Sequence, residues 1–234
     1  MDLFFHNTID LKNPAFVFSD EESRHLSKVL RKQPGDLVAV TDGKGLEVHI
    51  QIQNISSRKT NGHLVEKIVH PAPKHQTHIA IAPTKNNVRL EWFLEKATEI
   101  GIHRITPLLC QHSERKVIKH DRLTKILQAA LKQSQQFHLP QLDELISFET
   151  FVAQQKKGYI AHCNTGEKFD LADIAATEKS NCILIGPEGD FSVDEVTFAE
   201  KNNFQSISLG RQRLRTETAA LVACHTLSLI HRNI

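Results

Sequence analysis

The feature that most constrains this chain is a pair of short predicted strands near its carboxyl end, each followed by a glycine loop. Residues 182–185 read Cys-Ile-Leu-Ile and lead into Gly-Pro-Glu-Gly at 186–189. Residues 207–209 lead into Gly210, and the loop that follows contains Arg211, Arg213 and Arg215. Short apolar runs bounded by Gly and Pro are typical of buried strands that end in tight loops. In open α/β sheets, ligands bind at the carboxyl ends of the strands.

A helix is predicted after each loop. Ser192 precedes Glu195 with the spacing of a capping box, so a helix is expected to begin there and to run to about Asn202. Thr216 is expected to cap a final helix that extends to about residue 230. The two glycine loops would then face each other across one helix.

Glycine at these positions permits positive φ and lets main-chain groups approach a ligand closely, so we expect a flat heteroaromatic ring held by main-chain hydrogen bonds. The loop at 186–189 lacks the Lys-Ser/Thr ending of a P-loop and does not fit the G-x-G-x-x-G dinucleotide pattern. For this loop alone, an ordinary strand-to-helix turn explains the glycines about as well. The second loop and its arginines favour a binding site.

The two segments together resemble a known signature. Residues 185–192 and 209–219 are similar to the motifs of the ribosomal RNA uridine-N3 methyltransferase family, within the knotted SPOUT superfamily. The resemblance implies S-adenosylmethionine held in a deep trefoil knot at a homodimer interface. It also implies methylation of N3 of a uridine in 16S ribosomal RNA of the small subunit. Composition does not imply a knot, since general topology rules argue against one.

The composition is that of an ordinary globular protein with room for one large or two small domains. The formal net charge is only +2, so nucleic-acid binding has to depend on local basic clusters. The four cysteines include no C-x-x-C pair, which disfavours zinc. Three of them lie in apolar or strand-like contexts, which indicates buried free thiols in a reducing cytoplasm. The amino terminus is unlike a signal peptide, and no run approaches the roughly 20 apolar residues that span a bilayer. We therefore expect a cytoplasmic protein without metal or membrane contact.

The amino-terminal part is expected to form a small barrel of short strands, which we place at residues 1–72. Strands are expected at 16–18, 37–40, 46–52 and 64–69, with one helix at 21–30 capped by Ser19 or Asp20. The motif at 25–31 resembles the H-x-x-x-V-L-R pattern of the family, in which this domain is a PUA-like RNA-binding barrel. A solvated helix face is otherwise the commoner explanation for so small a basic cluster. The predicted RNA contacts here are Arg24, His25, Lys28, Arg31 and Lys32.

The remainder, 73–234, alternates strands and helices and is expected to form a mainly parallel α/β sheet. Strands are expected at 77–82, 105–109 and 159–163, and helices at 89–100, 123–131 and 148–155. Trp92 lies off the apolar stripe of its helix, and a core contact is favoured over a contact with the barrel or a partner chain.

Three further segments resemble the family: residues 84–92, the Ser-Glu-Arg at 113–115, and 132–134. The first is one residue longer than the usual form. Gln136 stands where many members have arginine, and Asp190 stands where glycine is usual. The second change is tolerable because Asp adopts turn conformations readily.

Roles for single residues follow from the implied reaction. Loss of the uracil N3 proton gives an anion, and we hypothesise that Arg215, with Arg89 or Arg115, stabilises it. Glu217 would orient Arg215 or accept the proton, although a carboxylate favoured by the helix dipole explains it equally well. Further RNA contacts are expected from Arg115, Arg211 and Arg213. Cofactor contacts, mostly through the main chain, are expected from Leu184, Gly186, Gly189, Leu209, Gly210 and Leu214, with His162 as a further lining residue.

Other functions remain open on the sequence. The chain could be a ribosomal RNA-binding assembly factor without chemistry, or a SPOUT methyltransferase that acts on another RNA position. A metal hydrolase is disfavoured because the histidines are scattered. Dimerisation also stays open, since core packing within one chain explains the small residues of the final helix as well as a dimer does: Ala219, Ala220, Val222, Ala223 and Leu227.

Overall fold

The computed structural model describes residues 1–174 and 180–232, and the chain divides into two compact units. The first unit contains Met1–Ala72 and Leu131–Leu139, and the second contains Pro73–Ala130 and Pro140–Ile234. The predicted domains, 1–72 and 73–234, stay a prediction. The division by contacts differs from them in assigning Leu131–Leu139 to the first unit.

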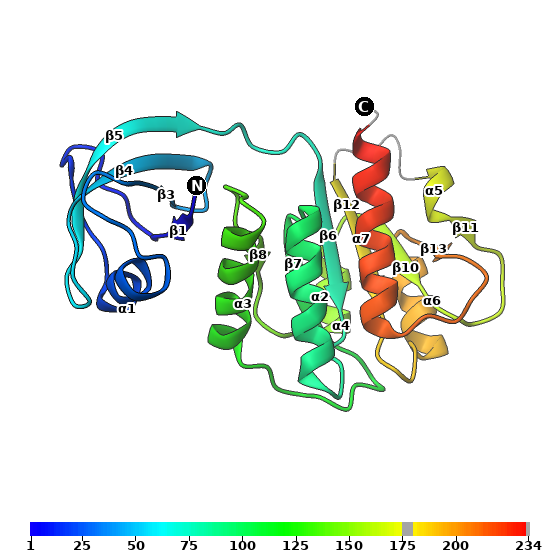
Figure 1. Cartoon of the computed structure of the whole chain (residues 1–234). Helices are drawn as coiled ribbons and strands as arrows, with labels where there is room; N and C mark the ends of the chain where they lie inside the picture. Colours follow the sequence, from blue (N-terminus) through cyan, green and yellow to red (C-terminus); the bar gives the residue numbers. More distant parts are fainter. Residues whose placement is uncertain (175–179, 233–234) are drawn as a thin grey trace. The chain divides into compact units, whose positions relative to one another are not determined.

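The first unit is built on a five-stranded sheet with the order β1-β3-β4-β5-β2 (Figure 1). Only the pair of β1 and β3 is parallel; the other pairs are antiparallel. The predicted strands are all present, and β1 was missed. The bounds are Leu3–Phe5 (β1), Ala15–Val17 (β2), Leu37–Thr41 (β3), Leu46–Asn54 (β4) and Asn61–Val69 (β5). Alternate residues of these strands, with Phe18 and Leu26, form its apolar core.

The predicted helix of this unit forms in two parts. Ser19 caps α1 (Asp20–Arg24), and Glu22 completes a capping box with the Ser19 main chain. The chain continues as a π-helix, η1 (His25–Val29), and Arg31 then adopts a positive φ of 53°. The prediction of a single helix over 21–30 was therefore only partly right, because the wider turn of η1 interrupts the α-helix.

The segment 131–139 joins the first unit through a glycine turn. Gly45 donates its N–H to Phe137 O at 2.8 Å, and Leu139 donates to Gly43 O at 2.8 Å. A Cβ on Gly43 would lie 2.9 Å from Leu139 Cβ, so only glycine allows this approach. The ring of His70 stacks on Phe137 with centroids 3.8 Å apart.

The second unit is an α/β layer with the strand order β11-β13-β10-β12-β6-β7-β8, with β9 paired to β7 (Figure 1). All of its recorded strand pairs are parallel, as predicted. The strands are Gln76–Ile81 (β6), Arg104–Leu109 (β7), Gln141–Leu142 (β8), Ile146–Ser147 (β9), Gly158–Ala161 (β10), Phe169–Asp170 (β11), Ser180–Ile185 (β12) and Phe204–Ser208 (β13). The trefoil knot remains a prediction of the resemblance.

The two faces of this sheet are covered by different helices. α2 and α7 pack side by side on one face, and α4 and α6 lie on the other (Figure 1). The helices are Asn87–Ile100 (α2), His120–Gln133 (α3), Phe148–Gln154 (α4), Leu171–Ile174 (α5), Val193–Lys201 (α6) and Thr216–Arg232 (α7). Ser192 and Glu195 form the predicted capping box of α6. Thr216 is the first residue of α7 rather than its cap, because its hydroxyl is engaged elsewhere.

The burial of side chains on α2 and α7 tests two expectations about packing. Trp92 is 41% exposed on α2, so the predicted core contact is wrong: the residue lies off the buried stripe of its helix. Ala220, Ala223 and Leu227 of α7 are fully buried within this chain, so core packing accounts for them. Of the four free cysteines, Cys163 is exposed and the other three are buried.

A buried polar network joins β6 and β7. His78 Nε2 lies 2.7 Å from Thr106 Oγ1, and the Thr106 hydroxyl donates to Asp143, which also accepts from Arg104 Nε at 2.7 Å. Because the single hydroxyl proton goes to the carboxylate, Thr106 accepts from His78, whose neutral ring is protonated on Nε2. Burial lowers the pKa of His78 to about 4, and the positive charge of Arg104 adds to this effect.

We expect acid to destabilise the protein through His78. Its pKa is about 4 in the folded chain, against 6.5 for an unperturbed histidine, so between these values the unfolded chain binds a proton that the folded chain does not. The free energy of unfolding then falls as the pH is lowered, by up to about 3 kcal/mol for this group. His78→Gln keeps a donor toward Thr106 but cannot titrate, so it should flatten the dependence of the urea midpoint on pH.

The control is His103→Gln, at a less buried histidine whose pKa is also lowered by burial. It should flatten the same curve less. An unchanged pH dependence in His78→Gln would contradict the assignment.

Candidate functional site

A cavity of about 740 Å³ opens at the carboxyl ends of the central strands of the second unit. It lies where parallel sheets of this kind bind ligands. Both predicted glycine loops line it, together with the end of β10 and the first turns of α2 and α7. Its walls are formed by Arg89, 161–163, Lys168, 185–188, Asp190, 207–216 and Ala219.

The first loop is held in shape by Asp190, which has a positive φ of 66°. Its carboxylate accepts hydrogen bonds from the main-chain N–H of Cys163 at 2.7 Å and of Phe191 at 2.8 Å. The Asp190 N–H donates to Pro187 O at 2.9 Å and closes the turn. One side chain therefore fixes the loop and ties it to the end of β10.

The second loop begins at Gly210, whose φ is 118°. A Cβ there would meet no atom within 4 Å, so backbone conformation rather than crowding calls for glycine. At the far end of the loop, the Thr216 hydroxyl donates to Gly186 O at 3.0 Å. Thr216 is 6% exposed, so this bond is buried, and it joins the two loops directly.

Arg89 lines the cavity and contacts Glu217, which is not itself among the lining residues. Arg89 Nε lies 3.6 Å from Glu217 Oε1, and Glu217 is 7% exposed in the first turn of α7. Glu217 Oε2 is also buried and has no hydrogen-bond partner among the described residues. A buried carboxylate with one unused oxygen is costly, and such groups concentrate at functional sites. Arg215 lines the cavity from the residue that precedes α7.

Arg115 has a supporting position. Its guanidinium donates to the main-chain oxygens of Thr84 and Lys85. The Lys85 N–H in turn donates to Glu188 Oε1 of the first glycine loop at 3.0 Å. Arg115 thus holds the segment that precedes α2, and it is not among the residues that line the cavity.

His162 lines the cavity at the end of β10. Its Nε2 lies 2.9 Å from Ser206 Oγ, and the Ser206 hydroxyl donates to Glu200 Oε1 at 2.7 Å. Ser206 therefore accepts from His162, which assigns the proton of the neutral ring to Nε2. Burial, followed by the positive charge of Lys168, lowers the pKa of His162 and favours the neutral ring.

The cavity gathers most of the predicted site residues of this unit. Those that line it are Arg89, His162, Gly186, Leu209, Gly210, Arg211, Arg213, Leu214 and Arg215. Two predicted cofactor contacts lie outside the lining. Leu184 is fully buried in the sheet core, and Gly189 packs so closely on His112 that a Cβ would come within 3.1 Å of it.

Sequence reasoning missed two contacts that build this site. The buried bond from Thr216 to Gly186 and the bridging carboxylate of Asp190 each join segments that are far apart in the chain. Lys168 also lines the cavity, from a loop that carried no motif. Only the positive-φ preference of Asp offered a signal for one of them.

The predicted RNA contacts of the first unit lie on α1, η1 and the turn that follows. Arg24, His25, Lys28 and Arg31 are at least partly exposed. Lys32 pairs with Asp2 at 2.9 Å, and its side chain is only 22% exposed. Four of the five side chains are therefore accessible to a phosphate backbone.

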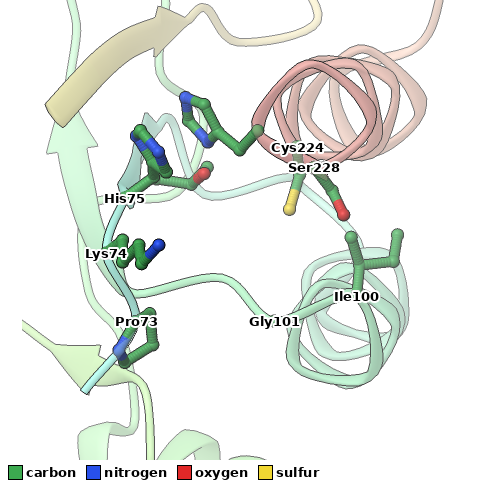
Figure 2. Close-up of a pocket in the computed structure, with 9 residues that line it drawn as sticks. Pro73, Lys74, His75, Ile100, Gly101, Cys224 and Ser228 are labelled. Atoms are coloured by element: carbon green, nitrogen blue, oxygen red, sulfur yellow. The ribbon is translucent and has the colours of Figure 1, made fainter. Parts of the chain in front are cut away.

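A second cavity, of about 420 Å³, lies at the amino ends of the strands. Figure 2 shows Lys74 and His75, which precede β6, facing Cys224 and Ser228 of α7 across it. The His75 ring stacks on His231 with centroids 4.3 Å apart. None of the predicted site residues lines this cavity. Ligands of α/β sheets bind at the opposite end, so the first cavity is the candidate site.

The chain matches two known protein families. The family described as "RNA methyltransferase domain" matches residues 70–228, and "RNA methyltransferase PUA domain" matches residues 18–60. The chain belongs to the RNA methyltransferase family. The second match gives the first unit its expected PUA-like character. Among the described residues, no helix is long and apolar enough to cross a membrane, and no group of three or more His, Cys, Asp or Glu could hold a metal ion.

Relatives within the family are similar over most of their length. The ribosomal RNA small subunit methyltransferase E of Rickettsia conorii is 29% identical, covering 91% of this chain and 88% of its own. The protein of the same name from Mesomycoplasma hyopneumoniae is 30% identical, with coverages of 68% and 72%.

Solved structures agree with this membership. A probable rRNA-methyltransferase of Porphyromonas gingivalis has a TM-score of 0.90 and 36% identity, covering 98% of this chain and 99% of its own. The ribosomal RNA small subunit methyltransferase E of Neisseria gonorrhoeae, bound to S-adenosyl methionine, has a TM-score of 0.83 and 25% identity, with coverages of 96% and 95%.

Proposed function

We propose that this protein transfers a methyl group from S-adenosylmethionine to N3 of a uridine in 16S ribosomal RNA of the small subunit. The observation that carries the proposal is one cavity lined by both glycine loops and by four arginines. The relatives are named as methyltransferases of small-subunit ribosomal RNA, and the Neisseria gonorrhoeae protein binds S-adenosyl methionine.

The cavity fits the methyl donor in size and in chemistry. A volume of about 740 Å³ lies in the range of cofactor sites. Gly186 and Gly210 expose main-chain groups at the cavity wall, as a heteroaromatic ring requires. The main-chain contacts would come from Gly186, Leu209, Gly210 and Leu214. When bound, the donor supplies an already activated sulfonium methyl group.

The residues of the chain would align the uridine and manage its proton. Arg215 at the cavity wall would stabilise the negative charge that develops on the uracil as N3 loses its proton. Glu217, which is not among the residues that line the cavity, would hold Arg89 in the wall through their contact of 3.6 Å and would be the acceptor of that proton. Alignment of the uracil N3 with the methyl group would supply much of the remaining rate enhancement.

RNA would reach the cavity across basic side chains. Arg211 and Arg213 are exposed on the second loop, and Lys168 lies at the cavity wall. The exposed cations of α1 and η1 in the first unit would contact the phosphate backbone elsewhere on the RNA. Such contacts predict RNA binding that weakens steeply with salt.

The protein would act in the cytoplasm as a homodimer with a knotted second unit. Val88 is 65% exposed and Trp92 41% exposed, one turn apart on α2, and Leu229 of α7 is 44% exposed. Apolar side chains at i and i+4 form a ridge on a helix surface. A second copy packed on α2 and α7 would remove this ridge from water.

Cofactor binding should depend on the backbone of the second loop. Gly210→Val places a β-branched residue at a φ of 118°, so the loop has to rearrange, and S-adenosylhomocysteine binding should be abolished in a folded protein. Gly35→Val is the matched control, because Gly35 also has a positive φ of 96° and no atom near its Cβ position, but lies in the first unit. Isothermal titration calorimetry measures both. Normal binding by Gly210→Val would refute the two-loop site.

Turnover should depend on Arg215 and Glu217. Arg215→Ala and Glu217→Gln should each lower kcat roughly 100-fold with little change in the Kd of S-adenosylhomocysteine. Glu195→Gln is the control for Glu217, since both carboxylates are buried in the first turn of a helix. It should affect stability rather than kcat. Normal turnover in both test variants would show these roles to be wrong.

The decisive experiment for the reaction is transfer of labelled methyl to small ribosomal subunits that lack this modification, followed by nucleoside analysis. Label recovered as 3-methyluridine is the expected result. Subunit binding without transfer would favour an assembly factor, and label in another nucleoside would leave a methyltransferase with a different target.

A further inference from the structure

Phe169 is the most exposed phenylalanine of this chain. All 12 phenylalanines lie among the described residues, and Phe169 is 52% exposed, whereas the others are buried or half-buried. A single exposed apolar side chain needs no explanation by itself. The surroundings of this ring therefore decide what it can do.

Phe169 lies at the edge of the sheet beside the candidate site. β11 pairs in parallel with β13, with Phe169 opposite Ile207 and Asp170 opposite Ser208 (Figure 1). Both partners on β13 line the cavity, and so does Lys168, the residue before Phe169. The main chain of Phe169 is thus held by a strand pair next to residues of the cavity wall, close to where the second glycine loop begins.

The charges at this edge indicate what would cover the ring. Lys168 lines the cavity, and Arg211 and Arg213 are exposed on the loop that follows β13. Glu167 and Asp170 are the acidic neighbours of Phe169 along the chain. The cavity lining contains two carboxylates, Glu188 and Asp190, which already accept main-chain hydrogen bonds. Cations still predominate, because five line the cavity: Arg89, Lys168, Arg211, Arg213 and Arg215. An aromatic ring beside cations is the combination that single-stranded RNA uses, with bases stacked on the ring and phosphates on the cations.

We propose that Phe169 stacks on a nucleobase next to the target nucleotide and so positions the RNA at the cavity. This inference rests on the proposed function, because it takes RNA as the substrate. Phe169 is a positioning residue: the ring contacts a flanking base, and it does not line the cavity itself. Stacking on any base is favourable, so the ring would contribute to affinity more than to sequence selection.

The first test compares variants of Phe169 for binding to unmodified small-subunit ribosomal RNA. Phe169→Ala should weaken RNA binding and raise the KM for RNA roughly 10-fold, and Phe169→Tyr should restore both. The Kd of S-adenosylhomocysteine and the Tm should not change, because the ring is largely exposed. Val193→Ala is the matched control, since Val193 is 70% exposed on α6.

A spectroscopic test separates stacking from a general effect on the fold. The chain has one tryptophan, so Trp92→Phe combined with Phe169→Trp gives a single reporter at the proposed position. RNA should quench its fluorescence. Unchanged fluorescence, or normal RNA affinity in Phe169→Ala, would overturn the proposal.

Other outcomes are equally informative. If Phe169→Ala alters the sedimentation coefficient of the free protein, the ring belongs to a contact between copies and the proposal fails. If the wild type binds RNA without transferring methyl, the proposed function fails while the quenching still tests Phe169. If the wild type binds no RNA, both fail.

Discussion

The buried hydrogen bond from the Thr216 hydroxyl to Gly186 O is the contact on which the candidate site depends. Gly186 follows β12 directly and Thr216 begins α7, so this one bond sets where the final helix starts relative to the central strand. Breaking this bond would leave a buried donor and a buried acceptor unpaired, and this costs more free energy than the bond contributes to stability. Local opening of the site is therefore unfavourable. With the Asp190 carboxylate on the Cys163 N–H, it joins the ends of β10 and β12 to the loop after β13.

Local signals explain what could be predicted from the sequence. The parallel sheet, the helix caps at Ser19 and Ser192, and the glycine loops all depend on residues close together in the chain. Most of the predicted residues that line the cavity come from two adjacent motifs. The bond between Thr216 and Gly186 joins residues 30 apart in sequence, and no periodicity or spacing reports such a pairing. The docking of 131–139 on the first unit was missed for the same reason.

The charged side chains around the site differ in how deeply they are buried. Glu217 is buried against Arg89, while Arg211, Arg213 and Arg215 are exposed on the loop. A carboxylate in a low-dielectric wall acts on one neighbour at short range, whereas exposed cations act over about a Debye length and are screened by salt. The inner pair therefore suits chemistry at one atom, and the outer arginines suit the binding of a polyanion. Because the net charge of the chain is only +2, the binding of a polyanion depends on where these arginines lie and not on an overall excess of positive charge.

Asp190 shows how a departure from a family pattern can be more than a tolerated change. The position has a φ of 66°, which glycine adopts freely and Asp adopts at a modest cost. Asp offsets that cost with two main-chain hydrogen bonds that glycine cannot make, to Cys163 and Phe191. Since glycine also has more freedom in the unfolded chain, Asp narrows the unfolded ensemble as well. The first loop is therefore held in shape by a side chain whose hydrogen bonds a glycine at this position would lack.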